Sequence, residues 1–166
     1  GTKKEKLALV NVGLAAGDLA VALRPNGIAG LYWQAVALGR QAELKGIRKS
    51  LSSVKPIRKN MLAILKQDPN YARAYFVLSR LYRKAPKFIS IGNPKKSLIY
   101  INKALAIDPT DSIYLLEKAR VLKKLKKRSQ AKQVIQQLLA LPTDDPRYLS
   151  YQVIRDQEAG RRLYKK

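Results

Sequence analysis

The chain is 166 residues long and 46% hydrophobic, which suffices for one compact domain or one short solenoid with a buried core. It carries 34 lysine and arginine residues against 11 acidic ones, a formal net charge of +23, so an acidic partner is expected. The absence of cysteine and histidine excludes thiolate nucleophiles, histidine proton transfer and ordinary zinc sites. The sequence also has no phosphate-binding glycine motif and no nucleophile elbow. We therefore expect a binding protein rather than an enzyme, with no cofactor and no metal.

An apolar helix is predicted first, over residues 7–23, and a turn follows at residues 24–27. Four small or polar residues interrupt the apolar run: Asn11, Gly13, Gly17 and Asp18. The run is therefore interpreted as too short and too polar to span a membrane, and the protein as soluble.

A degenerate helix pair completes the N-terminal region, residues 7–69. Tyr32 and Trp33 occupy positions where a helix-pair repeat packs a bulky side chain, so both are predicted to lie in the core, with a place in a ligand pocket as the alternative. The linker of this pair contains Gly46 and Lys55-Pro56 and is longer than a standard repeat allows.

Three dipeptides that end in proline punctuate the rest of the chain: Asp68-Pro69, Asp108-Pro109 and Leu141-Pro142. Proline cannot continue a helix and disfavours helical geometry in the residue before it, so each dipeptide is predicted to close a helix. The spacing of the prolines, 40 and then 33 residues, matches helix-pair repeats of the tetratricopeptide (TPR) type.

Two repeats are predicted from this punctuation, over residues 70–109 and 110–142. Small and large residues alternate at the positions where paired helices would cross, among them Tyr75, Leu78, Ser79, Tyr82, Gly92, Ser97, Ile101 and Ala104. The first repeat has an insertion at residues 85–91, where Phe88 and Ile89 either cover a groove or pack on their own helix pair.

A final capping helix is predicted over residues 145–164, with Asp145 as its N-cap and Pro146 in its first turn. A basic end that includes Lys165 and Lys166 follows. Together the elements predict one all-α domain, residues 3–166: a superhelix of about three helix pairs plus flanking helices.

The first helix of a TPR pair faces the concave groove, and this register predicts the groove residues. They are Arg73, Phe76, Arg80, Arg83 and Lys84 in one repeat, Leu116, Arg120, Lys123 and Lys124 in the next, and Phe88 from the insertion. Cations beside a few apolar side chains fit an anionic or mixed anionic and apolar ligand or partner. The alternative is that these cations are simply the solvated faces of a basic protein.

Residues 118–132 contain eight basic residues and no acidic one. Such a run attracts polyanions by counterion release, but no recognisable nucleic-acid fold and no interleaved aromatic residues accompany it. Nucleic acid is therefore not the partner that we expect.

Three stretches are more specific than a generic repeat: residues 30–39 (GLYWQAVALG), 81–86 (LYRKAP) and 90–98 (SIGNPKKSL). Together they resemble the T-component family of TRAP transporters. The resemblance implies a periplasmic or envelope-associated lipoprotein that associates with a solute-binding protein and can form homo-oligomers. It also implies membrane association only through a lipid anchor outside these 166 residues. The alternative is a cytoplasmic TPR scaffold that binds an acidic peptide or helix of a partner protein.

Overall fold

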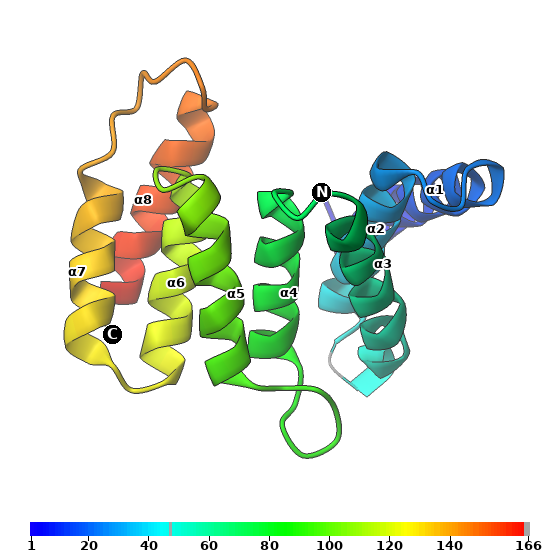
Figure 1. Cartoon of the computed structure of the whole chain (residues 1–166), viewed down its shortest axis with the longest axis horizontal. Helices are drawn as coiled ribbons and strands as arrows, with labels where there is room; N and C mark the ends of the chain where they lie inside the picture. The colour runs from blue at the N-terminus through cyan, green and yellow to red at the C-terminus, as the bar shows by residue number, and fades with distance from the viewer. Residues whose placement is uncertain (47, 165–166) are drawn as a thin grey trace.

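The computed structural model describes residues 1–46 and 48–164, and this part of the chain is all-α with no β-strand, as predicted (Figure 1). Lys165 and Lys166 lie outside the described residues. In chain order the elements are α1 (Lys3–Leu23), α2 (Ile28–Lys45), the 3-10 helix η1 (Arg48–Ser53), α3 (Val54–Gln67), α4 (Ala72–Lys84), α5 (Pro94–Ile107), α6 (Ser112–Lys124), α7 (Arg128–Leu139) and α8 (Ser150–Tyr164).

The helices stack as successive pairs, which is the architecture of a TPR superhelix. Helix α2 packs on α3, α4 on α5, and α6 on α7. Two further helices flank the pairs, because α1 lies along α2 at one end and α8 packs on α6 and α7 at the other (Figure 1).

The prolines close helices where the sequence predicts. Helix α3 ends at Gln67 and α5 at Ile107, and the aspartates that follow, Asp68 and Asp108, share one extended geometry with φ near −132° and ψ near 92°. Asp111 then begins α6, because its side chain accepts a hydrogen bond of 2.9 Å from the backbone N–H of Ile113.

Small residues let α4 and α5 approach closely. Ser79 and Ser97 are fully buried, and each hydroxyl donates to the backbone carbonyl of the other serine, at 3.0 and 2.8 Å. Leu78 and Ile101 are also fully buried, Leu78 in the core that α4 shares with α2 and α3, and Ile101 in a core with Phe76 and Tyr114. The predicted alternation of small and large residues is confirmed here.

The linker of the first pair is more ordered than predicted. Residues 48–53 form η1, and α3 begins at Val54, so Pro56 lies inside the first turn of the helix rather than in a loop. Proline is tolerated there because the first backbone N–H groups of a helix have no intrahelical acceptor.

The predicted start of the final helix is wrong by five residues. Helix α8 begins at Ser150, and Asp145 instead holds a turn by accepting hydrogen bonds from the backbone and side chain of Arg147. The helix does cap the stack, because Gln157 donates to the carbonyls of Leu138 and Leu139 in the last turn of α7 and of Leu141 just after it.

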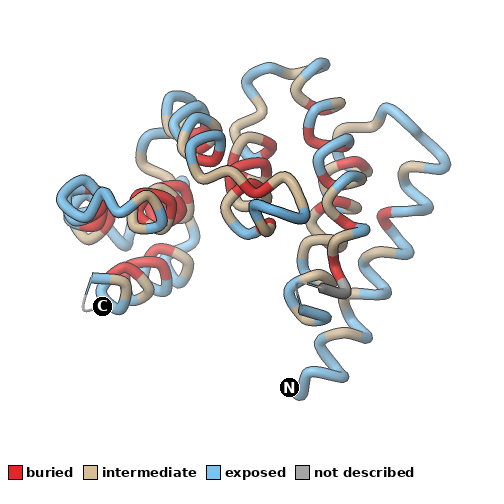
Figure 2. The backbone as a smooth tube through the Cα atoms, turned by 90° about the horizontal axis from the view of Figure 1, so that it is seen from below, coloured by how far each residue is buried: buried red, intermediate tan, exposed pale blue. Residues whose placement is uncertain are grey.

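The N-terminal helix differs most from the prediction. Helix α1 spans 21 residues and, in the described part of the chain, is the one helix long and apolar enough to cross a membrane. Figure 2 shows it mostly exposed with a few half-buried positions, and Gly17 is its one buried residue. Trp33 of α2 is also 58% exposed, so the prediction that it lies in the core is wrong.

Candidate partner-binding face

Most of the predicted groove residues lie on the first helices of consecutive pairs, α4 and α6, which pack against each other. The exposed ones are Arg73, Lys84, Lys124 and Phe88, the half-buried ones are Arg80, Arg83, Arg120 and Lys123, and the buried ones are Phe76 and Leu116. We call the surface that the cations form, together with Arg40 of α2, the cationic face.

Phe76 and Leu116 are not available to a ligand, which corrects their prediction as groove residues. Phe76 is 9% exposed and packs on Tyr114, with ring centroids 5.3 Å apart. Leu116 is 2% exposed and belongs to the core between α6 and α7. The predicted groove face included two positions too many on α4 and α6, because neighbouring helices cover both side chains.

Glu43 of α2 gathers three cations of the cationic face. Its carboxylate binds Lys84 at 2.6 Å, Arg80 at 2.5 Å and Arg40 at 3.4 Å. Burial alone raises the pKa of Glu43, but the hydrogen bond from Lys84 and the charge of Arg80 outweigh it, so the pKa lies below its ordinary value. This carboxylate ties α2 to α4 and neutralises one of three positive charges.

Glu117 is the residue of this face that sequence reasoning missed. It is fully buried in α6, and Arg83 of α4 clamps it with two hydrogen bonds, Nε to Oε1 at 2.6 Å and Nη2 to Oε2 at 2.9 Å. The signal in the sequence was weak: Glu117 is the one acidic residue on the two predicted groove helices. Arg83 is therefore largely committed to holding the fold.

Arg120 is a half-buried cation that lies near the pair formed by Arg83 and Glu117. It makes no ion pair within the described residues. Burial, followed by the charges of Arg83 and Arg80, lowers the pKa of its guanidinium, although the charge of Glu117 acts in the opposite direction. The lowered pKa therefore reflects first the partial burial of this guanidinium.

The remaining cations donate hydrogen bonds to backbone carbonyls or are exposed to solvent. Lys123 donates to the carbonyl of Leu163 at 2.9 Å, and Lys124 donates to the carbonyl of Arg83. The cationic face thus has eight cations against two carboxylates, Glu43 and Glu117; the cations are Arg40, Arg73, Arg80, Arg83, Lys84, Arg120, Lys123 and Lys124.

A cleft of about 680 Å³ opens where α4, α6 and α8 begin. It shares Arg73 with the cationic face, but its polar lining also includes three carboxylates and three phenols: Asp68, Asp108, Asp111, Tyr71, Tyr114 and Tyr148. The Tyr148 hydroxyl donates to Asp108 at 2.6 Å, and burial, followed by the charge of Asp108, raises the pKa of Asp111 to about 6. The sequence did not predict this cleft, because Arg147 and Tyr148 were assigned to a helix.

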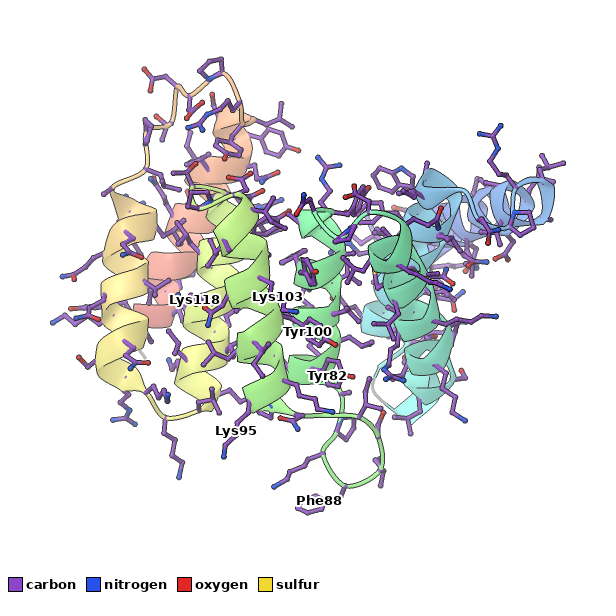
Figure 3. All side chains as sticks on the ribbon, in the orientation of Figure 1. Tyr82, Phe88, Lys95, Tyr100, Lys103 and Lys118 are labelled. Carbon is purple, nitrogen blue, oxygen red and sulfur yellow. The ribbon has the colours of Figure 1, made fainter. Side chains whose placement is uncertain are left out.

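The inserted loop does not cover the cationic face. Phe88 is 93% exposed and contacts Lys87, whose ammonium lies 5.6 Å from the ring centroid (Figure 3). Neither predicted role, as groove cover or as packing on its own helix pair, is visible in this structure. A contact with a partner stays a prediction.

Tyrosines and lysines do alternate on another surface, between α4 and α5. Tyr100 stacks on Tyr82 at 5.5 Å and on Tyr75 at 6.3 Å, and Lys96 and Lys103 lie over the outer two rings (Figure 3). Because the ring faces are occupied by each other and by lysines, they offer no open platform for a nucleobase.

Comparisons with known proteins agree with this fold. The family model described as regulator of microtubule dynamics protein 1-3 matches residues 1–87, slightly over half of the chain. The crystal structure of a thermophilic TPR protein from Thermus thermophilus superposes with a TM-score of 0.64 and 21% sequence identity, covering 98% of this chain and 90% of that one. At this identity the likeness shows the fold alone. No curated protein sequence matches the chain. The TPR part of the sequence resemblance is thereby confirmed, and the TRAP T-component part is not.

Proposed function

This chain belongs to the regulator of microtubule dynamics protein 1-3 family, and from that premise we propose that it is a protein-interaction scaffold whose cationic face binds an acidic peptide or helix of a partner. A stack of helix pairs presents a rigid, extended surface, which suits recognition of another chain. The proposal makes the chain a non-catalytic module.

The observation that supports an acidic partner is the excess of cations over carboxylates on the cationic face, with Arg120 half-buried there and without an ion pair in the described residues. Burial lowers the pKa of this guanidinium, and the charges of Arg83 and Arg80 act in the same direction, against the charge of Glu117. A carboxylate of a partner would relieve that repulsion and could accept two hydrogen bonds from the planar guanidinium. Binding of an anion is therefore favoured more strongly here than at an exposed lysine.

A protein partner is favoured over a small apolar ligand. The two apolar side chains expected to line the groove, Phe76 and Leu116, are buried in the core. The side chains that remain on this face are cations, and they are spread over α2, α4 and α6. They match several carboxylates along a peptide better than they match one small apolar ligand.

The test is binding of a fluorescently labelled glutamate-rich helical peptide, with its glutamine counterpart as the neutral control. Arg73→Ala together with Arg120→Gln removes two cations that make no ion pair in the described structure. We expect affinity for the acidic peptide to fall by about tenfold or more, because each charged hydrogen bond contributes about 1.5–3 kcal/mol.

The matched control is Lys59→Ala together with Lys66→Ala, which removes two exposed cations from α3. We expect it to weaken binding by less than about twofold, since exposed charges are screened by salt. Equal losses in the two variants would mean that only net charge matters, and would contradict a defined binding face.

Tubulin is a candidate partner because the family takes its name from the regulation of microtubule dynamics. Co-sedimentation with polymerised tubulin tests this candidate, with the same two pairs of variants. Failure of the wild-type chain to sediment would exclude tubulin while leaving other acidic partners open.

A periplasmic or envelope-associated role beside a TRAP-type solute transporter is a separate proposal, and it rests on the sequence resemblance alone. Cell fractionation and capture of a solute-binding protein test it. Recovery of the natural protein in the cytoplasmic fraction would contradict it.

A further inference from the structure

Helix α1 carries large apolar side chains on both sides: Leu7, Val10, Leu14 and Val21 are half-buried toward the protein, and others on the outer side are exposed. A stripe of large apolar residues runs along its outer face at helical spacing: Leu9 (73% exposed), Val12 (70%), Leu19 (60%) and Leu23 (79%). A helix that packs on a core in water has polar residues on this outer face. The exposed stripe is therefore a surface that something apolar covers.

The polar residues that interrupt the apolar run bind α2. Asn11 accepts a hydrogen bond from Gln41 at 2.9 Å, and Asp18 accepts one from Gln34 at 2.7 Å. Between them, Gly17 lies so close to α2 that a Cβ atom would be 2.8 Å from the Cα of Gln34. These contacts hold α1 along α2, so the helix lies on the protein instead of standing apart as a lone span.

A second apolar feature adjoins the stripe. An apolar groove of about 510 Å³ runs between α1 and α2, and its lining includes Gly13, Ala16 and Ala20 of α1 and Trp33 of α2. Since Trp33 is 58% exposed, the groove and the stripe offer one contiguous apolar surface of two helices.

The charges around this surface decide what covers it. Lys3, Lys4 and Lys6 lie beside Glu5 in the first turns of α1 and Arg24 caps its other end, whereas residues 7–23 contain one charged side chain, Asp18, which accepts a hydrogen bond from Gln34. A second copy of the chain would bring these cations near their equivalents and add another +23 molecule. Anionic lipid headgroups would pair with the same cations while acyl chains accept the leucines.

We infer that the outer face of α1, with Trp33, lies in the interface of an anionic membrane. The helix is about 31 Å long at 1.5 Å per residue, and it would lie in the membrane plane with α2 as its support. This departs from the expectation that a lipid anchor is the only membrane attachment. It does not depend on the residues of the cationic face in α4 and α6, although Arg40 belongs to that face and also lines the groove.

The experiment is sedimentation of the full chain with vesicles of phosphatidylcholine containing phosphatidylglycerol, and with vesicles of phosphatidylcholine alone. Trp33 is the one tryptophan of the chain, so its emission reports directly on this surface. We expect binding to the anionic vesicles, with a blue shift of the emission as the indole leaves water.

Leu9→Glu together with Leu19→Glu places two charges on the stripe at exposed positions that the fold tolerates. We expect the vesicle partition coefficient to fall by about tenfold or more and the blue shift to vanish. The matched control, Leu62→Glu together with Ile99→Glu, makes the same change of charge at exposed apolar residues of α3 and α5 and should retain most binding.

Two outcomes would overturn the inference. One is equal loss of vesicle binding in the stripe variant and its control, which would leave only bulk charge. The other is that the wild-type chain forms a dimer, does not bind vesicles, and becomes monomeric in the stripe variant. A second copy of the chain, and not a membrane, would then cover the stripe. Circular dichroism confirms that each variant folds, and unchanged binding of the acidic peptide by the stripe variant separates this test from that of the cationic face.

Discussion

Individual charges in this protein acquire their roles from burial, and Arg83 is the clearest case. On the sequence it is one of many cations, but in the structure it forms two hydrogen bonds to the fully buried carboxylate of Glu117. Removing one partner of such a pair leaves an uncompensated charge in the core, which is strongly destabilising. Substitution of Arg83 therefore cannot report on partner binding alone, and Arg73 and Arg120 are the better choices.

Asp111 provides a prediction of pH dependence. Its pKa is raised to about 6, first by burial and then by the charge of Asp108, so the folded state binds a proton more tightly than the unfolded state. The stabilisation from this proton is complete below about pH 4 and is lost as the pH rises through about 6. We expect unfolding free energy to fall by about 1–3 kcal/mol over that range, after allowance for partial solvent exposure.

Urea denaturation at several pH values measures this slope, and Asp111→Asn is the informative variant. Asparagine keeps the N-cap of α6 but does not titrate, so the variant should lose the part of the slope that belongs to this site. An identical pH profile in both proteins would assign the slope to other groups.

At the scale of helices, the sequence predicted what depends on local chemistry. Helices α3 and α5 end at Asp-Pro because proline acts on its immediate neighbours, and this holds whatever surrounds the turn. Trp33, Phe76 and Leu116 were assigned wrongly because their exposure depends on where a second helix lies. The start of α8 was also missed, since Asp145 has a good capping side chain but uses it in a turn.

Gly92 gives a prediction at this scale, because it fixes the return of the inserted loop to α5. It is buried, and a Cβ atom there would collide with the carbonyl oxygen of Ala85 and lie 2.8 Å from the backbone nitrogen of Lys87. Gly92→Ala should therefore displace the loop and lower unfolding free energy by about 2–4 kcal/mol.

Gly39→Ala is the matched control, since nothing lies within 4 Å of the added Cβ in the middle of α2. There alanine should stabilise the chain by up to about 1 kcal/mol, through its higher helix propensity. Thermal unfolding of both variants checks the pair, and a neutral Gly92→Ala would show that the loop moves freely.

The whole molecule carries a charge of +23, and its stability should reflect that repulsion. Added salt screens like charges across the surface, and it also weakens exposed ion pairs such as Arg162 with Glu158, which contribute little. We expect the melting temperature to rise by about 2–4 °C per kcal/mol of repulsion removed as sodium chloride is added. A falling melting temperature in the same titration would mean that attractive pairs dominate.

The pairing of successive helices also bears on how the chain reaches this fold. Apart from the contacts of α6 with α4 and α8, the extensive packing within the described residues joins elements that are consecutive along the chain or separated only by η1. Such a topology has low contact order, so little loop-closure entropy opposes folding and rapid kinetics are expected. Each pair can complete its own core while the next is still being synthesised, and the serine hydrogen bonds between α4 and α5 form as soon as those two helices meet.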